Sequence, residues 1–314
     1  MPTQLYLGID MGGTNIKIAV VNRNGEIEEE TSLKTELKQS PENVIRSVIN
    51  RASGLKNYSK VKSIGIGIAG DISCEKGIVR FSPNLPKWKN LKLKEIVEKL
   101  TKKKVFVDND ANTAAIGAFW LDAKGKPDNL ICVTLGTGVG GGFIFGKKLY
   151  RGATYTAGEI GHITIDANGR KCKCGNSGCA ETYIGAKYIS EYAKHYLNKH
   201  RSKIIDGMTG KNRSLATPEI LHSAALKGDK SAIEIWKYVG EKLGILLAGI
   251  INLANPDTIV LCGGISRTGK FLTDPAKKEI TERAFRSAVK GCKIKVSHYT
   301  SKLGVVGAAM LADQ

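Results

Sequence analysis

One histidine and three cysteines lie close together in the middle of the chain. His162 is followed by Cys172, Cys174 and Cys179, which offer one nitrogen and three sulfur ligands at short spacing. Such a set fills all four positions round a tetrahedral zinc ion, and closed sites of this kind are structural rather than catalytic. Glycines within the cysteine segment let it fold round an ion. The spacing therefore predicts a structural zinc site.

Two glutamates bracket this segment. Glu159 stands three residues before His162, and Glu181 stands two residues after the last cysteine. Carboxylates held in a pocket accept hydrogen bonds from hydroxyl groups, and Asn84 and Asn109 add polar groups of the kind that line a sugar site. The alternative is that both glutamates are solvated surface residues. A metal that fixes both neighbourhoods favours the sugar site.

Two glycine-rich turns follow strand-like segments and could bind phosphate. Glycines let a backbone approach phosphate oxygens, and the amides of such turns donate to anions. An acidic residue beside the first turn could hold Mg²⁺ directly or through water. The alternative for each is a plain hairpin turn. The candidates are Asp10, Gly12, Gly13, Thr14, Asn15 and Lys17 in the first turn, and Thr134, Gly136, Thr137 and Gly138 in the second.

The triplet Asp108-Asn109-Asp110 ends one predicted strand and begins a predicted helix. Asp and Asn are good helix caps, so capping is one interpretation. The other is that one carboxylate takes a proton from a substrate hydroxyl, as in phosphoryl transfer. Taken alone, the triplet leaves both interpretations open.

These residues must be positioned by alternating strands and helices. Strand, glycine-rich turn and strand occur at 5–21 and again at 130–145, which suggests two related domains facing a cleft. Residues 200–214 are polar and basic and are expected to form a loop. The predicted class is α/β with a mixed sheet in each half. Predicted helices cover 41–52, 91–100, 111–121, 186–197, 218–226, 232–253, 275–289 and 303–312, and further strands cover 64–69, 78–81, 105–107, 258–262 and 294–297.

The composition excludes some functions and leaves others open. The formal net charge of +19 could indicate nucleic-acid binding, but Lys and Arg are dispersed with Glu among them, which favours a solvated basic surface. The longest apolar run, 243–254, is shorter than the roughly 20 residues of a membrane span. No secretory signal opens the chain. We therefore expect a cytoplasmic protein with neither a membrane nor a nucleic-acid partner.

Taken together, these motifs resemble the ROK family of sugar kinases and sugar-responsive repressors, within the actin-like ATPase superfamily. The resemblance runs essentially from end to end. It is carried by Asp10-Met11-Gly12-Gly13-Thr14, Leu135-Gly136-Thr137-Gly138, Asn109-Asp110, Glu159-x-Gly161-His162, Cys172-x-Cys174-Gly-x-x-Gly-Cys179-x-Glu181 and Gly263-Gly264.

This resemblance implies an actin-like ATPase (ribonuclease H-like) fold, with a small domain of residues 1–112 plus 302–314 and a larger domain of residues 113–301. It implies phosphorylation of a hexose at its 6-hydroxyl by ATP and Mg²⁺, with Asp110 as the base and Gly263 and Gly264 near the adenosine. A homodimer or homotetramer is expected. The implied sugar contacts are Asn84, Asn109, Asp110, Glu159, His162 and Glu181.

Glucose is the expected substrate. N-acetylhexosamines, mannose, allose and fructose stay open as alternatives, since one sequence does not define the volume of the pocket. The family also contains repressors, which carry a helix-turn-helix domain before the first phosphate motif. Only nine residues precede Asp10 here, so we expect the kinase rather than a repressor or a basic nucleic-acid-binding protein.

Overall fold

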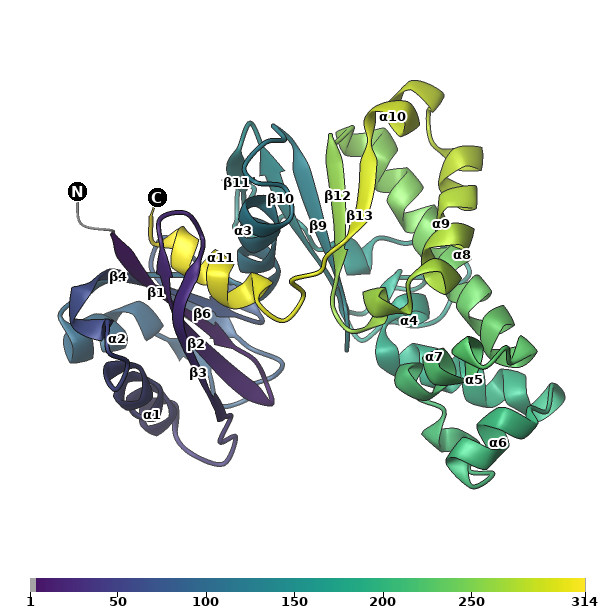
Figure 1. Cartoon of the computed structure of the whole chain (residues 1–314), viewed down its shortest axis with the longest axis horizontal. Helices are drawn as coiled ribbons and strands as arrows, with labels where there is room; N and C mark the ends of the chain where they lie inside the picture. Colours follow the sequence, from purple (N-terminus) through teal and green to yellow (C-terminus); the bar gives the residue numbers. More distant parts are fainter. Residues whose placement is uncertain (1–3, 314) are drawn as a thin grey trace. The chain divides into compact units, whose positions relative to one another are not determined.

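The structure is a computed structural model that describes residues 4–313, and these form two compact units. The first unit comprises the chain up to Cys132, Gly142–Gly158 and the segment from His298 onward. The second comprises Val133–Gly141 and Glu159–Ser297. The domain limits expected at residues 112 and 302 remain a prediction. Figure 1 shows the order of the elements along the chain.

A five-stranded mixed sheet forms the centre of the first unit, in the order β3-β2-β1-β4-β8. β1 pairs antiparallel with β2 and parallel with β4, and β4 pairs parallel with β8. A small sheet, β5-β6-β7, follows β4 in the chain. The strands are β1 (Leu5–Met11), β2 (Asn15–Asn22), β3 (Ile27–Lys34), β4 (Val61–Ile68), β5 (Asp71–Ser73), β6 (Ile78–Phe81), β7 (Lys89–Leu91) and β8 (Lys104–Asn109).

Helices cover both faces of this sheet because alternate side chains of each strand point to opposite faces. α1 (Pro41–Ser53) and α2 (Leu93–Thr101) share a buried apolar cluster with one face. α3 (Asp110–Leu121) and α11 (Leu303–Leu311) share a second cluster with the other. Figure 1 shows the two pairs on opposite sides of the strands.

α11 lies directly on the sheet at two glycines. Gly8 of β1 pairs with Gly65 of β4, and both face this helix. A Cβ at either position would overlap a backbone carbonyl oxygen of α11, at Val305 and Ala308 respectively. The missing side chains therefore let the last helix of the chain approach the central strands.

A second sheet, β11-β10-β9-β12-β13, contains the predicted second hairpin. β10 pairs antiparallel with β11, whereas β12 pairs parallel with β13, so this sheet is also mixed. The mixed α/β class predicted from the sequence is confirmed. Its strands are β9 (Leu130–Leu135), β10 (Val139–Phe145), β11 (Lys148–Tyr150), β12 (Thr258–Cys262) and β13 (Lys293–Val296).

Most of the second unit is helical. α8 packs against α9 at a glycine, since a Cβ at Gly240 would stand 2.5 Å from the Leu272 carbonyl oxygen. Within residues 4–313, none of the helices combines the length and the hydrophobicity that a membrane span requires. The helices of the second unit are α4 (Glu181–Ile184), α5 (Ala186–Lys199), α6 (Lys203–Thr209), α7 (Pro218–Leu226), α8 (Lys230–Ala254), α9 (Lys270–Arg283) and α10 (Arg286–Gly291), with 3₁₀ turns at Ile160–His162, Arg213–Leu215 and Ile265–Thr268. A further 3₁₀ turn, Tyr58–Lys60, lies in the first unit.

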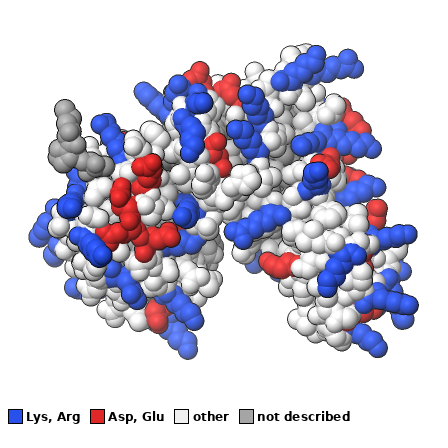
Figure 2. Space-filling view, in the orientation of Figure 1, with Lys and Arg blue, Asp and Glu red and all other residues white. Residues whose placement is uncertain are grey.

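The basic residues are dispersed over the surface. Figure 2 shows Lys and Arg spread over the visible face with Asp and Glu among them. Several of these charges form exposed ion pairs within single helices, such as Lys187 with Glu191 and Lys278 with Glu282. Pairs of this kind contribute little to stability, roughly 0–1 kcal/mol each.

Candidate functional site

The first glycine-rich turn joins β1 to β2 and is held by a residue far along the chain. The Gly12 amide donates to the Asn15 carbonyl oxygen at 3.1 Å. Thr35 donates its hydroxyl to the Gly12 carbonyl oxygen at 2.7 Å and its amide to the Thr14 carbonyl oxygen at 2.9 Å. Sequence reasoning missed Thr35, because neither its type nor its spacing marks it. The result is a fixed backbone turn that an anion can approach closely.

Asp10 is the last residue but one of β1, beside this turn and opposite Lys17 of β2. Burial raises the pKa of Asp10 above its ordinary value, and Lys17 acts in the opposite direction. The start of α11 lies against the carboxylate, since a Cβ at Gly304 would stand 2.6 Å from Asp10 Oδ2. Lys17 Nζ donates to the Ser301 carbonyl oxygen at 2.7 Å. A carboxylate beside a phosphate-type turn suits Mg²⁺, which proteins bind through one or two carboxylates and water.

The three residues Asp108, Asn109 and Asp110 at the end of β8 and the start of α3 lie in three different environments. Asn109 caps α3, because its Oδ1 accepts from the Ala111 amide at 2.8 Å and its Nδ2 donates to the Gly70 carbonyl oxygen at 3.0 Å. Asp108 is fully buried. Asp110 opens α3 in a half-buried position, and its Oδ1 accepts from the Ala111 amide at 3.0 Å. Asp110 is therefore the more accessible of the two carboxylates.

The strand register brings the first turn and this triplet to one edge of the sheet. Asp10 pairs with Gly67 of β4, and Gly67 pairs with Asp108 of β8. Two strand spacings separate the backbones of Asp10 and Asp108, which is about 10 Å. Because the three strands are parallel, their carboxyl ends share this edge.

Asn84 joins the same group within the first unit. It is exposed, and a Cβ at Gly13 would stand 3.1 Å from Asn84 Cβ. Asn84 therefore lies next to the first glycine-rich turn. Of the predicted residues, the first unit thus holds the first glycine-rich turn with Asp10 beside it, together with Asn84, Asn109 and Asp110.

The second glycine-rich turn joins β9 to β10. The Gly136 amide donates to the Gly138 carbonyl oxygen at 3.0 Å, and the Gly140 amide donates to Thr134 Oγ1 at 3.2 Å. Thr137 is exposed at its tip. This turn therefore resembles the first in having glycines, a threonine and a hydrogen-bonded backbone.

Glu181 connects this second turn to α4. Its Oε2 accepts a hydrogen bond from the Val139 amide at 3.1 Å, and a Cβ at Gly138 would overlap the same oxygen. Glu181 is also the first residue of α4. A carboxylate with one oxygen on the backbone keeps its other oxygen for a ligand.

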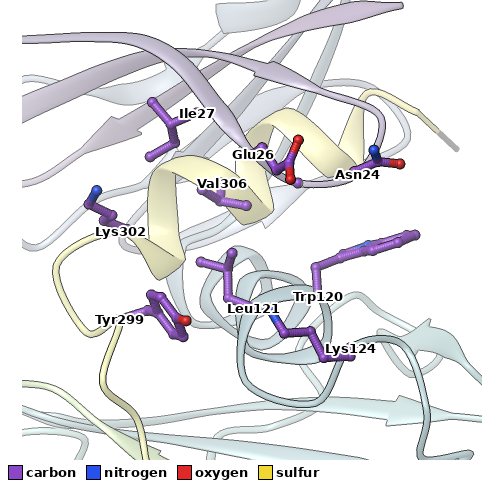
Figure 3. Close-up of a pocket in the computed structure, with 10 residues that line it drawn as sticks. Asn24, Glu26, Ile27, Trp120, Leu121, Lys124, Tyr299, Lys302 and Val306 are labelled. Carbon is purple, nitrogen blue, oxygen red and sulfur yellow. The ribbon is translucent and has the colours of Figure 1, made fainter. Parts of the chain in front are cut away.

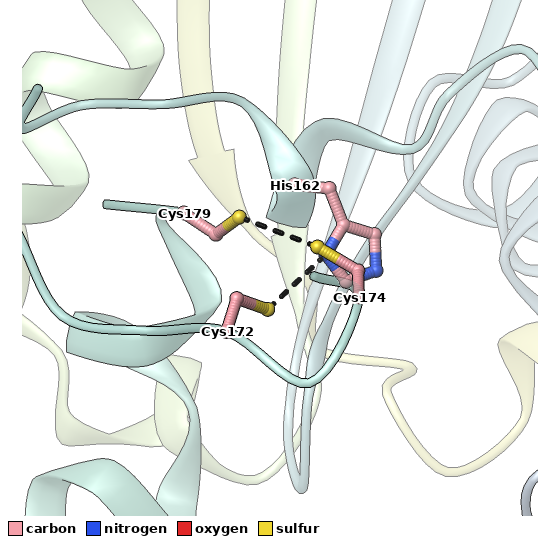
Figure 4. Close-up of side chains that lie close together, drawn as sticks. All are labelled: His162, Cys172, Cys174 and Cys179. Carbon is pink, nitrogen blue, oxygen red and sulfur yellow. Dashed lines mark hydrogen bonds between the residues drawn. The ribbon is translucent and has the colours of Figure 1, made fainter. Parts of the chain in front are cut away.

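The predicted metal ligands converge in the second unit. The ligand atoms of His162, Cys172, Cys174 and Cys179 all lie within 4.8 Å of one another. Cys172 Sγ lies 3.7 Å from His162 Nδ1, and Cys174 Sγ lies 3.6 Å from Cys179 Sγ (Figure 4). Burial raises the pKa of Cys179 to about 12, with further increases from its cysteine neighbours. One nitrogen and three sulfur donors at this spacing fit a tetrahedral zinc ion, whose charge would favour the thiolates.

The cysteine segment folds tightly behind the cluster. The Cys172 amide donates to the Asn176 carbonyl oxygen at 2.8 Å, and the backbones of Thr164 and Cys179 pair in an isolated antiparallel β-bridge. Gly178 has a φ of +72°, and a Cβ there would overlap the Asp166 carbonyl oxygen. The loop therefore needs glycine at this position for conformation and for space.

His162 presents its two ring nitrogens to different partners. Nδ1 faces Cys172, whereas Nε2 lies 3.9 Å from Glu159 Oε2. Both residues are accessible, since the side chains of His162 and Glu159 are 36% and 62% exposed. The histidine thus connects the cysteine cluster to an exposed carboxylate.

Gly263 and Gly264 follow β12 directly. Gly263 has a φ of +92°, and a Cβ there would overlap the Leu135 carbonyl oxygen beside the second turn. A Cβ at Gly264 would meet nothing within 4 Å. Packing therefore requires a glycine at position 263, whereas the space beside Gly264 is open.

A cavity of about 470 Å³ in the first unit contains none of the predicted site residues. Trp120 and Leu121 at the end of α3 and Val306 of α11 form part of its wall. Figure 3 shows its lysines, Lys124 and Lys302, on opposite sides, so that they do not converge on one anion.

Comparison with known proteins agrees with this geometry. A family model described as "ROK family" matches residues 6–314. The glucokinase of Thermotoga maritima is 33% identical over 314 residues, which cover 100% of this chain and 99% of that protein. The xylose repressor of Caldicellulosiruptor bescii is 31% identical, over 98% of this chain and 78% of the repressor.

A solved structure is similar over the same length. It is a ROK family glucokinase from Streptomyces griseus in complex with glucose and AMPPNP. The TM-score is 0.82 and the identity 32%, with 99% of each chain covered.

Proposed function

Because this chain belongs to the ROK family, we propose that it is an ATP-dependent sugar kinase that phosphorylates glucose at the 6-hydroxyl. The observation that carries the proposal is the position of Asp110. It is a half-buried carboxylate at the sheet edge that also holds the Asp10–Gly13 turn. A kinase needs a carboxylate near a phosphate-binding turn to orient the attacking hydroxyl. Full-length identity with a glucokinase supports the choice of reaction.

In this reaction Asp110 takes the proton of the sugar 6-hydroxyl as that oxygen bonds to the γ-phosphorus of ATP. The bond from this phosphorus to the β–γ bridging oxygen breaks, and ADP leaves. ATP supplies the phosphoryl group and Mg²⁺ neutralises its charge. Asp10 helps to hold the metal ion, and Lys17 adds positive charge nearby. The two glycine-rich turns bind the phosphates, with contacts from Thr14, Asn15, Thr134 and Thr137. Gly263 and Gly264 lie near the adenosine. A positioned base of this kind contributes about 10²–10⁴-fold to the rate.

Six residues are the proposed sugar contacts. Asn84 and Asn109 act with Asp110, and Glu159, His162 and Glu181 supply the remaining contacts. The exposed carboxylate of Glu159 and the second nitrogen of His162 support this role. Glucose is the proposed substrate, and N-acetylhexosamines, mannose, allose and fructose are the alternatives.

A structural zinc ion is part of the proposal. The four convergent donors and the tight loop behind them support it. His162 would hold the ion through Nδ1 together with the three cysteines, which would fix the ring and leave Nε2 for a second partner. The ion takes no part in proton transfer, because four protein ligands leave no open position.

The second candidate is a sugar-responsive regulator without kinase activity, which the 31% identity with a xylose repressor favours. Sugar binding with no ADP release would indicate this function. The proposed use of ATP makes the cytoplasm the expected compartment. A homodimer or homotetramer is expected, and light scattering on the purified protein measures it.

ADP release measured over a panel of hexoses tests the proposal. We expect ATP- and Mg²⁺-dependent turnover with glucose, and hexose 6-phosphate as the product by NMR. A higher kcat/KM for another sugar of the panel would correct the substrate. Absence of turnover with every sugar would overturn the kinase proposal.

A further inference from the structure

A buried carboxylate lies next to the proposed base and receives four hydrogen bonds. Asp108 Oδ1 accepts from the Asn109 amide and from Asn112 Nδ2, each at 2.8 Å, and from Cys74 Sγ at 3.3 Å. Its Oδ2 accepts from Arg151 Nε at 2.7 Å. The two oxygens of an ionised carboxylate accept about four such bonds, so Asp108 is fully engaged. Asp108 therefore connects several segments of the first unit and does not act as the base.

The donors come from separate parts of the first unit. Cys74 follows β5, Asn112 lies in α3, and Arg151 follows β11. Arg151 brings the only full positive charge among these four donors, and its side chain is 24% exposed while that of Asp108 is 0% exposed. The arginine therefore compensates a charge that is completely removed from water.

The segment that begins at Arg151 is anchored twice more. The Ala157 amide donates to the Arg151 carbonyl oxygen at 3.0 Å, which closes the segment into a loop. The Tyr155 hydroxyl donates to Glu75 Oε2 at 3.1 Å, and Tyr155 has a φ of +68°, which a tyrosine rarely adopts. The chain then continues directly to Glu159.

We propose that Arg151 is a positioning residue for the sugar site, which acts through Asp108. Its guanidinium pairs with the buried Asp108 carboxylate and fixes its position, so that Asp108 accepts from the Asn109 amide and from Asn112 and thereby holds the Asn109–Asp110 turn. The same side chain fixes the start of the loop that leads to Glu159. Arg151 touches neither the sugar nor the phosphates in this proposal, which rests on the proposed sugar-kinase function.

The loss of Arg151 has a defined physical consequence. An unpaired buried carboxylate is costly, so without Arg151 the Asp108 side chain would shift or admit water. Its hydrogen bonds with the Asn109 amide and Asn112 would then weaken. The Asn109–Asp110 turn would then loosen, whereas the Gly12–Thr14 turn, held by Thr35, would not.

Arg151→Met tests this prediction, and Arg80→Met is the matched control. Arg80 Nη1 also lies 2.7 Å from an aspartate oxygen, Asp71 Oδ1, but both of these side chains are at least 40% exposed. For Arg151→Met we expect kcat to fall about 10–100-fold, the size of effect that misplacement of a reacting group produces. The KM for sugar should rise, and the KM for MgATP should stay within twofold. Arg80→Met should match the wild type.

Two further measurements keep the test decisive. Arg151→Lys retains the charge and should recover part of kcat, and it replaces Arg151→Met if the latter does not fold. Hydrogen exchange of the amides at 109–113 should be faster in Arg151→Met than in Arg80→Met. That exchange needs no turnover, so it tests the positioning role even if the wild type phosphorylates no sugar. Wild-type kcat and exchange in Arg151→Met, or an equal rise in both KM values, would overturn the proposal.

Discussion

Asp108 and Asp110 are separated by one residue, yet their carboxylates have different surroundings. Asp108 is buried among four donors, whereas Asp110 is half-buried at the start of α3. The triplet alone does not indicate this division, because the charge that compensates Asp108 comes from Arg151, far along the chain. Local sequence predicted a helix start here, and the tertiary contacts determine which acid is accessible.

Asp10 provides a prediction about stability. Burial raises its pKa, so the folded state holds a proton there more tightly than the unfolded state does. Above that pKa the ionised group destabilises the fold, and the effect disappears below the ordinary pKa of 3.8. We expect Asp10→Asn to raise the Tm at pH 7 without nucleotide or metal, and the gain to shrink as the pH falls toward 4.

The measurement is thermal unfolding of both proteins between pH 4 and pH 7, followed by a kinase assay. The same substitution should lower turnover, because the proposed metal contact is lost. A Tm that falls at pH 7 would show that the Asp10 carboxylate stabilises the empty protein, contrary to this account.

Among the elements of the first unit, α11 and α3 pack closely against each other. Gly307 of α11 lies against the Thr113 carbonyl oxygen of α3, and a Cβ there would overlap that oxygen. Both helices also border the proposed site, α3 through Asp110 and α11 through Gly304. Their packing therefore supports the residues that the reaction uses.

Gly307→Ala should destabilise the first unit by about 1–3 kcal/mol or more, because overpacking forces the backbone to shift. Gly249→Ala is the control: it is also a helical glycine, but a Cβ there meets nothing within 4 Å. That change should stabilise α8 by roughly 0.5–1 kcal/mol, the usual gain from alanine in a helix. Urea unfolding measures both, and equal midpoints for the two variants would contradict the packing described.

Periodic apolar patterns predicted most of the elements, and the exceptions have physical causes. The long helix expected at 232–253 is α8, Lys230–Ala254. β3 was missed because it alternates half-buried and exposed residues and has no fully buried face. The loop expected at 200–214 contains α6, which Ser202 caps together with buried Asp229.

One helix boundary was wrong. A helix was expected to begin at Pro275 and run to residue 289, but α9 covers Lys270–Arg283 with this proline inside it, and α10 follows. Proline normally disrupts a helix interior. Here it packs against Gly240 of α8, where a Cβ would stand 3.0 Å from the proline Cβ. A contact with another helix thus outweighs the local preference.

Motif spacing predicted the residues of the candidate site better than it predicted the contacts that hold them in place. The side-chain donor atoms of His162 and the three cysteines converge as their spacing indicated, because a short segment carries three of the four. Thr35 and Arg151 were not anticipated, because each contacts its partner from a distant part of the sequence. Long-range hydrogen bonds leave no periodic or spacing signal in a single sequence.

At the scale of the whole chain, the proposed residues are distributed over both units, and the second contains the four proposed zinc ligands. We expect about one zinc ion per chain by metal analysis. Removal by a chelator should lower the Tm and raise the KM for sugar, because His162 loses its orientation. A stable, fully active metal-free protein would exclude a structural zinc.

Cysteine variants localise that effect. Cys174→Ser should reduce the zinc content and the Tm, since it removes one ligand atom of the four. Cys292→Ser is the control, because this half-buried cysteine lies in the same unit outside the cluster. Equal zinc content in both variants would contradict the ligand assignment.

The central claim is that Asp110 accepts the proton of the sugar hydroxyl, and glucose-dependent ADP release by Asp110→Asn tests it most directly. Asp128→Asn, at an exposed ion pair with Lys147, is the control. We predict that Asp110→Asn keeps the wild-type Tm and loses at least about 100-fold in kcat, while the control retains full activity. Turnover by Asp110→Asn close to that of the wild type would contradict the account.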